Sequence, residues 1–170
     1  MQRDHVDQLV EQWAQERPEL DTTGLRLAAR IVRLQRFLDQ ASSEEATRLG
    51  LQLGELNVLA ALRRAGEPYA LTPTELYRGL LISSGAMTNR LDRLEAEGLV
   101  TREPDPEDRR RIQVVLTPRG RTVIDEAMDD HTVSLKQAFA GIDDEQRAQL
   151  EDLLRAVLAR LEAEHDLRTP

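Results

Sequence analysis

The pattern of apolar and polar residues changes from helical spacing to strand spacing within residues 71–120. At the start of this segment, Thr72, Pro73 and Glu75 supply a capping hydroxyl, a proline suited to the first helical turn and a capping-box carboxylate. Apolar residues then recur at helical spacing as far as Gly98, and glycine is typical of the left-handed residue that follows a helix. The segment therefore predicts two consecutive helices.

The second of these helices is predicted to begin near Ser83 or Ser84, because serine is a favoured N-cap. Its buried stripe is marked by apolar residues three to five positions apart, namely Met87, Leu91, Leu94 and Leu99. At about 100° per residue, the opposite side of the helix is left to polar and small residues. That side consists of Gly85, Asn89 and Arg93, flanked by Thr88 and Arg90.

A helix face with an amide and guanidinium groups suits the major groove of DNA. Asparagine can pair with adenine and arginine with guanine, each through two hydrogen bonds. We therefore predict base contacts for Asn89 and Arg93, supported by Ser84 and Thr88. The alternative is an ordinary solvated helix face, which has the same composition.

Two strands are predicted after the second helix, one directly behind it and one over residues 112–116. The loop between them carries Asp108 followed by three consecutive arginines, Arg109, Arg110 and Arg111. A helix, a turn, a helix and a basic-tipped hairpin in this order predict a winged helix-turn-helix. We expect the arginines to contact DNA phosphates and the minor groove, and so to contribute affinity rather than base choice. The alternative for the arginine run is a surface charge cluster.

Amphipathic helices are predicted on both sides of this segment. Before it, residues 4–17 and 24–49 have apolar residues at helical spacing, and a short buried helix ends at Gly66. After it, one helix starts at Thr117 and another follows Gly141. The terminal helices carry more apolar surface than a core of this size needs, which favours packing against a second chain. The alternative is a monomer with an intramolecular bundle.

The predicted fold class is mainly α with a small β wing. We expect three parts along the chain. Residues 1–50 form an added helix and a helix for dimerisation and a ligand pocket, residues 51–120 form the winged helix-turn-helix, and residues 121–170 form C-terminal dimerisation helices.

A net charge of −8 and a pI near 5.0 argue against a nucleic-acid partner when the whole chain is considered. The charge is unevenly distributed, however. Residues 122–170 hold five basic and twelve acidic residues, whereas residues 83–121 hold eight arginines and seven acidic residues. We therefore expect the acidic segment to lie away from DNA, and the weakly basic segment to give modest non-specific affinity.

Several classes of protein are excluded by what the sequence lacks. There is no cysteine, which excludes disulfides and thiolate metal sites. His5, His131 and His165 share no ligand spacing with acidic residues, and no phosphate-binding glycine loop or nucleophile motif occurs, so we expect no metal, no cofactor and no enzymatic activity. No apolar run approaches the roughly 18 residues of a membrane span, and the acidic N-terminus is no signal peptide. We expect no membrane partner and a cytoplasmic location.

Residues 71–120 resemble the DNA-binding core of the MarR family of bacterial transcription regulators. The family's wing signature is Asp-x-Arg, a strand, and then Leu-Thr-x-x-Gly. It stands here as Asp108-Arg109-Arg110 and Leu116-Thr117-Pro118-Arg119-Gly120. The resemblance implies a homodimer. A two-fold dimer sets its two recognition helices roughly 34 Å apart, one turn of double-stranded DNA, and so predicts a pseudo-palindromic operator.

The chain is also similar to the urate-responsive UrtR branch of that family, which has an extra N-terminal helix bearing a tryptophan. The similarity rests on Trp13 and on two phrases, Gly54-Glu55-Leu56-Asn57-Val58-Leu59 and Met87-Thr88-Asn89-Arg90. The anion-binding positions of the branch fall on Trp13, Asn57, Arg90 and Arg102, and Asn57 stands where the branch has an aspartate. Two guanidinium groups suit a planar carboxylate or urate-like anion, and an indole can cover it.

Together these features predict a dimeric, sequence-specific DNA-binding repressor that is released by a small anionic ligand, either urate-like or a di- or tricarboxylate. A DNA-binding dimer without ligand control is one alternative. A helical protein-interaction module is another, although it has no use for a wing with three consecutive arginines.

Overall fold

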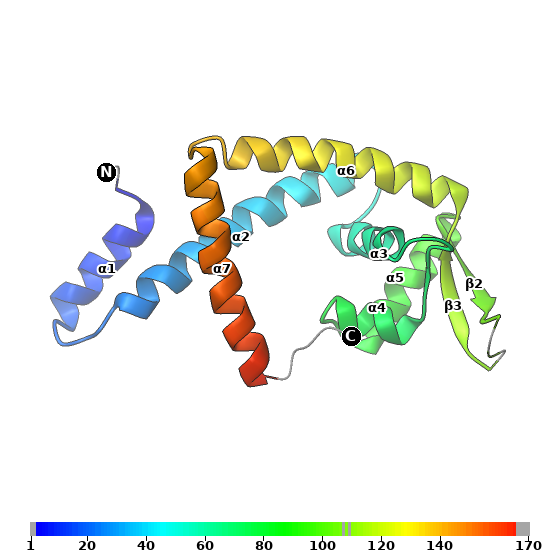
Figure 1. Cartoon of the computed structure of the whole chain (residues 1–170), viewed down its shortest axis with the longest axis horizontal. Helices are drawn as coiled ribbons and strands as arrows, with labels where there is room; N and C mark the ends of the chain where they lie inside the picture. The colour runs from blue at the N-terminus through cyan, green and yellow to red at the C-terminus, as the bar shows by residue number, and fades with distance from the viewer. Residues whose placement is uncertain (1–2, 107, 109, 166–170) are drawn as a thin grey trace. The chain divides into compact units, whose positions relative to one another are not determined.

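The computed structural model describes residues 3–106, 108 and 110–165, with side chains as far as Glu164. The chain divides into two compact units, Met1–Ser42 and Ser43–Pro170, and each is described by itself. As predicted, the fold is mainly helical with one small antiparallel sheet (Figure 1).

The first unit contains α1 (His5–Glu16) and most of α2 (Thr23–Arg48), which runs on into the second unit. Asp4 caps α1 in a capping box with Asp7. Both carboxylates also pair with Arg30 of α2, whose Nε lies 2.8 Å from Asp4 Oδ2 and whose Nη2 lies 2.7 Å from Asp7 Oδ1. The added N-terminal helix is therefore tied to α2 through its own cap.

The second unit contains the remaining helices and the sheet. In chain order its elements are α3 (Leu53–Arg64), β1 (Ala70–Leu71), α4 (Pro73–Gly79), α5 (Ser84–Ala96), β2 (Val100–Pro104), β3 (Ile112–Leu116), α6 (Pro118–Ala138) and α7 (Asp144–His165). The strand order is β1-β3-β2, and both pairings are antiparallel. The sequence predicts β2 and β3 but not β1, because two residues are too few to show an alternation.

The predicted helix ends are confirmed by cap geometry. Thr72 and Glu75 form a reciprocal capping box at α4, with Pro73 at the first helical position. Ser83 caps α5, and Gly98 follows that helix with a φ of 66°, in the left-handed region that favours glycine. Local sequence chemistry thus sets both helices of the helix-turn-helix.

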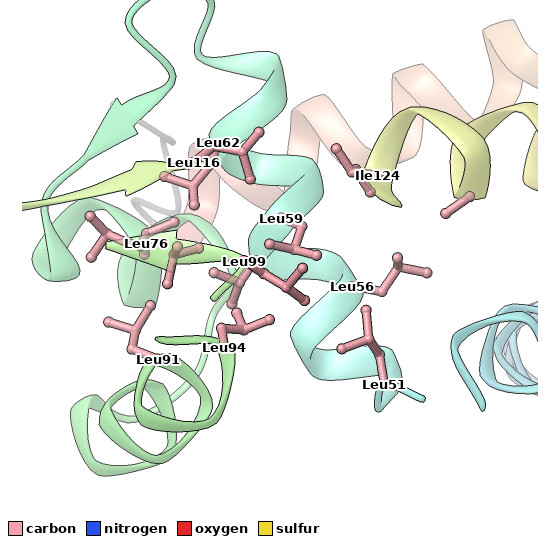
Figure 2. Packing of buried hydrophobic residues seen from close by; sticks show 14 of the residues in the cluster. Leu51, Leu56, Leu59, Leu62, Leu76, Leu91, Leu94, Leu99, Leu116 and Ile124 are labelled. Atoms are coloured by element: carbon pink, nitrogen blue, oxygen red, sulfur yellow. The ribbon is translucent and has the colours of Figure 1, made fainter. Parts of the chain in front are cut away.

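Helix α3 lies at the centre of the core of the second unit, where it contacts α4, α5, α6 and β3. Its Val58, Leu59 and Leu62 are fully buried. Figure 2 shows leucines of α3 facing leucines from α5 and β3. The predicted stripe of α5 is buried in this core, which fixes which side of α5 faces solvent.

Thr117 and Gly120 join the wing to the start of α6. The Thr117 hydroxyl oxygen accepts a hydrogen bond from the Gly120 N–H at 3.0 Å, and the hydroxyl donates to the Gly98 carbonyl at 2.9 Å. Gly120 is buried, and a Cβ there would collide with the carbonyl oxygen of Leu99. The Leu-Thr-x-x-Gly sequence therefore combines a helix cap with a close backbone contact that only glycine permits.

The C-terminal helices bury less than their pattern suggests. Among the apolar residues of α6, Ile124 and Ala127 are buried within the chain, whereas Met128 is 39% exposed. The apolar face of α7 remains exposed along most of its length, at Leu153, Leu154, Val157, Leu158 and Leu161. That face is available to a second chain.

Candidate DNA-binding site

Helix α5 presents to solvent the polar side that the sequence predicts for DNA contact. The Ser83 hydroxyl accepts a hydrogen bond from the Ala86 N–H at 3.3 Å and so starts the helix. Ser84, Thr88 and Asn89 are exposed, and the Thr88 hydroxyl donates to the Ser84 carbonyl at 3.0 Å. These three predicted contact residues therefore share the accessible side of α5.

Arg93, the fourth residue predicted on α5, is engaged within the protein. Its Nε donates to Glu55 Oε1, and its Nη2 donates to Gln52 Oε1 at 3.1 Å. Glu55 is only 4% exposed, and its other oxygen accepts from the Gln52 N–H at 2.8 Å in the capping box of α3. Arg93 thus compensates a buried carboxylate and ties α5 to the start of α3. Its base contact stays a prediction.

Replacing Arg93 by alanine is expected to lower the free energy of unfolding by about 1–2 kcal/mol, because a buried carboxylate loses its cationic partner. The double variant Arg93→Ala/Glu55→Gln should recover most of this loss, since a neutral amide needs no cation. Urea unfolding of both variants measures the effect. If the double variant were no more stable than Arg93→Ala, the ion pair with Glu55 would not be the way in which Arg93 stabilises the protein.

The guanidinium of Arg90 lies over the first turn of α3. A Cβ on Gly54 would stand 2.6 Å from Arg90 Nε, so a glycine is required for this approach. Asn57 is exposed and follows Gly54 by three residues, a spacing that places both on one side of the helix. The structure therefore places Arg90 beside the side of α3 that carries Asn57.

Arg102 of β2 pairs with a different side of α5. Its Nη1 donates to Glu95 Oε2 and its Nη2 to Asp92 Oδ1, both at 2.6 Å. Burial alone would lower the pKa of the Arg102 guanidinium, but the hydrogen bond to Asp92 and the charge of Glu95 outweigh it and raise that pKa. At about 100° per residue, Asp92 and Glu95 lie far around the helix from Arg90. The guanidinium of Arg90 therefore lies against α3, whereas that of Arg102 pairs with carboxylates on a different face of α5.

Trp13, the remaining residue predicted for the anion site, belongs to α1 in the first unit, where its side chain is 42% exposed. Asn57, Arg90 and Arg102 belong to the second unit. Their joint role in ligand binding stays a prediction.

Two aspartates organise the wing. Asp105 is buried, and its carboxylate accepts from Gln113 Nε2 at 2.9 Å and from the Asp108 N–H at 3.3 Å. Asp108 in turn accepts from the Arg110 N–H at 3.1 Å through its side chain and from the Arg111 N–H at 2.8 Å through its carbonyl. The aspartate of the wing signature thus shapes the backbone, while the side chains of Arg110 and Arg111 are exposed.

Arg111 also lines a cleft of about 500 Å³ between the loop end of the wing, where β3 begins, and the first turn of α4. Hydrogen bonds from Thr72 lower the pKa of Glu75 in this cleft, and the charge of Arg111 lowers it further. The cleft therefore keeps a carboxylate ionised next to the wing.

Arg109, the first of the three arginines predicted to contact DNA, lies outside the described residues.

Four side chains that position these arginines are not singled out by the sequence pattern, namely Gln52, Glu55, Asp92 and Glu95. For the first pair a signal exists, because Gln52 and Glu55 have the three-residue spacing of a capping box. The second pair has the three-residue spacing of a common helix face. Neither spacing shows which arginine each pair of side chains binds.

Within the described part of the chain, no helix is long and apolar enough to cross a membrane, and no cluster of histidine, aspartate or glutamate is arranged to hold a metal ion.

Comparison with known proteins relates most of the chain to one protein family. The model of the MarR family matches residues 49–111. The chain is 32% identical over 157 residues to the HTH-type transcriptional regulator PecS of Dickeya dadantii, covering 92% of each chain. A MarR variant from E. coli, solved in complex with operator DNA, is similar with a TM-score of 0.67 at 27% identity, covering 86% of this chain and 97% of that one. CouR from Rhodococcus jostii RHA1, solved with p-coumaroyl-CoA, has a TM-score of 0.68 at 24% identity over 77% of this chain and 90% of its own, a likeness of fold alone.

Proposed function

This chain belongs to the MarR family of DNA-binding transcription regulators. From that membership we propose that it is a homodimeric repressor that dissociates from operator DNA when a small anionic ligand binds. Its relatives are regulators rather than enzymes, so the prediction that the chain is not an enzyme is confirmed. The interaction module considered as an alternative is set aside on the same ground.

The exposed side of α5 carries the proposal for DNA contact. Ser84, Thr88 and Asn89 share that side, and their amide and hydroxyl groups match the hydrogen-bonding pattern of the major groove. Arg110 and Arg111 are exposed on the wing, where they suit phosphates and the minor groove. We assign base contacts to Asn89 and Arg93, and backbone contacts to Arg109, Arg110 and Arg111.

Selection of bound duplexes from a random pool tests this assignment, and we expect a pseudo-palindromic motif. Replacing Arg110 by alanine should weaken binding to all duplexes about equally and reduce the salt dependence by about one unit of slope. Arg160→Ala, an exposed arginine on α7, serves as the control and should change neither quantity. An Arg110→Ala protein with wild-type affinity and salt slope would contradict a DNA-contacting wing.

The proposed dimer is supported by α7, whose apolar face is exposed in the single chain. In this proposal residues 51–120 contact DNA and residues 121–170 supply helices for dimerisation. Residues 1–50 supply the added helix and a second helix for dimerisation and ligand binding. A soluble monomer rarely leaves a continuous apolar helix face uncovered.

We propose ligand-binding roles for Trp13, Asn57, Arg90 and Arg102, the positions that bind the anion in the urate-responsive branch. Because Arg102 is paired with Asp92 and Glu95, an anion shared with Arg90 must draw Arg102 away from these two carboxylates. Both carboxylates lie on α5, so their release adds uncompensated negative charge to the helix that faces DNA phosphates. This competition would couple anion binding to release from the operator.

Trp13 provides a direct measurement, because it is the only tryptophan in the sequence. Urate and small di- or tricarboxylates are expected to change its emission, and Arg102→Ala should abolish the response. Arg78→Ala, an exposed arginine on α4, should leave it intact. If no anion changes the emission, or if Arg102→Ala responds like the wild type, the alternative of a DNA-binding dimer without control through this pocket is favoured.

A further inference from the structure

Leu81, in the turn between α4 and α5, has an unusual conformation and an unusual exposure. Among the described residues of 51–120, Leu81 and Ile112 are the exposed large apolar side chains, and Leu81 is 79% exposed against 45% for Ile112. Its chain neighbours Leu80 and Ile82 pack against the core. Of the apolar residues in this turn, Leu81 is therefore the exposed one.

The backbone of Leu81 is left-handed, with a φ of 52°. The Leu81 N–H donates to the Arg78 carbonyl at 3.2 Å, and the Ile82 N–H donates to the Tyr77 carbonyl at 3.1 Å. This pair of hydrogen bonds is a Schellman motif, in which the left-handed position usually belongs to glycine. A leucine there is unfavourable because its Cβ approaches a carbonyl oxygen. Exposure and backbone strain thus coincide at one residue.

Neither feature stabilises the free protein, and residues with strained backbones cluster at functional sites. Leu81 stands two residues before the N-cap of α5 and three before Ser84, which lies on the exposed side of that helix. In the major groove of DNA, the C5-methyl group of thymine is the apolar contact available to such a side chain. A buried contact between the two would remove the exposed leucine from water.

We propose that Leu81 is a specificity-determining residue that contacts the methyl group of one thymine in each half-site of the operator. This inference rests on the proposed function, since it requires that α5 occupy the major groove. It adds an apolar contact to the polar base contacts assigned above.

The test compares thymine with deoxyuridine, which lacks only the methyl group, at each thymine of the selected operator. For the wild type, replacing the contacted thymine in one half-site should weaken binding about fourfold, the effect of burying one methyl group. Leu81→Gly should bind the thymine operator about fourfold more weakly per half-site and should no longer distinguish the two bases. Ile112→Ala, the matched exposed apolar residue on the wing, should keep the wild-type preference.

The thermal midpoint of Leu81→Gly should equal or exceed that of the wild type, because glycine accepts the left-handed conformation. A lower midpoint would show that Leu81 supports the fold, and a preserved thymine preference in Leu81→Gly would show that another residue contacts the methyl group. Either result overturns this inference while leaving DNA binding intact. A wild type that selects no duplex would instead overturn the proposed function itself.

Discussion

Replacing Gly120 by alanine should destabilise the second unit by about 3 kcal/mol, a large part of the roughly 5–15 kcal/mol by which an ordinary protein is stable. The added Cβ would collide with the carbonyl oxygen of Leu99 and would stand 2.9 Å from Leu116 Cδ1. The Leu99 carbonyl cannot move away easily, because it accepts a hydrogen bond from the Thr117 N–H at 3.1 Å. The backbone that connects α5 to β2 at Leu99 would have to move.

Urea unfolding measures this effect, with Gly141→Ala as the matched control. A Cβ at Gly141 meets no atom within 4 Å, so the same added methyl group should change stability by less than about 1 kcal/mol. If Gly120→Ala and Gly141→Ala unfolded at the same urea concentration, the close contact at Leu99 would not explain the glycine of the wing signature.

The parts of the fold that the sequence predicts are those fixed by local chemistry. Capping residues such as Thr72 and Ser83 act on N–H groups within three residues, so their effect is visible in the sequence itself. The buried stripe of α5 follows from the helical spacing of its apolar residues alone. Strand β1 is missed because Ala70 and Leu71 become a strand only by pairing with β3, some forty residues later in the chain.

In the candidate site, too, the sequence predicts the features that depend on local helical spacing and misses those that depend on tertiary packing. Helical periodicity places Asn89 on the exposed side of α5, as the structure does. Periodicity also places Arg93 there, but it cannot show that the start of α3 brings Glu55 and Gln52 within reach of its guanidinium. Long arginine side chains reach partners on neighbouring elements, and those partners depend on tertiary packing. The roles of arginines are therefore the least predictable part of such a site.

Helix α7 likewise depends on a partner that its own sequence does not identify. The helical spacing of its apolar residues is evident from the sequence, yet the face that they form remains exposed in a single chain. The spacing predicts an apolar face but does not identify the molecule that covers it. If a second copy covers it, a charge placed on this face must separate the two copies. Leu158 lies within the face and is 55% exposed, so glutamate there meets no obstacle in the single chain.

Leu158→Glu is therefore expected to convert the dimer into a monomer and to weaken binding to the full operator by about 10²–10⁴-fold, because the second half-site no longer binds as part of one molecule. Binding to a single half-site duplex should be unchanged, which separates loss of the dimer from damage to the DNA-binding surface. Ala156→Glu is the matched control, since it adds the same charge two residues earlier, about 200° around the helix. Light scattering gives the mass of each variant. A Leu158→Glu protein that remains dimeric and binds the full operator like Ala156→Glu would place the dimer interface elsewhere.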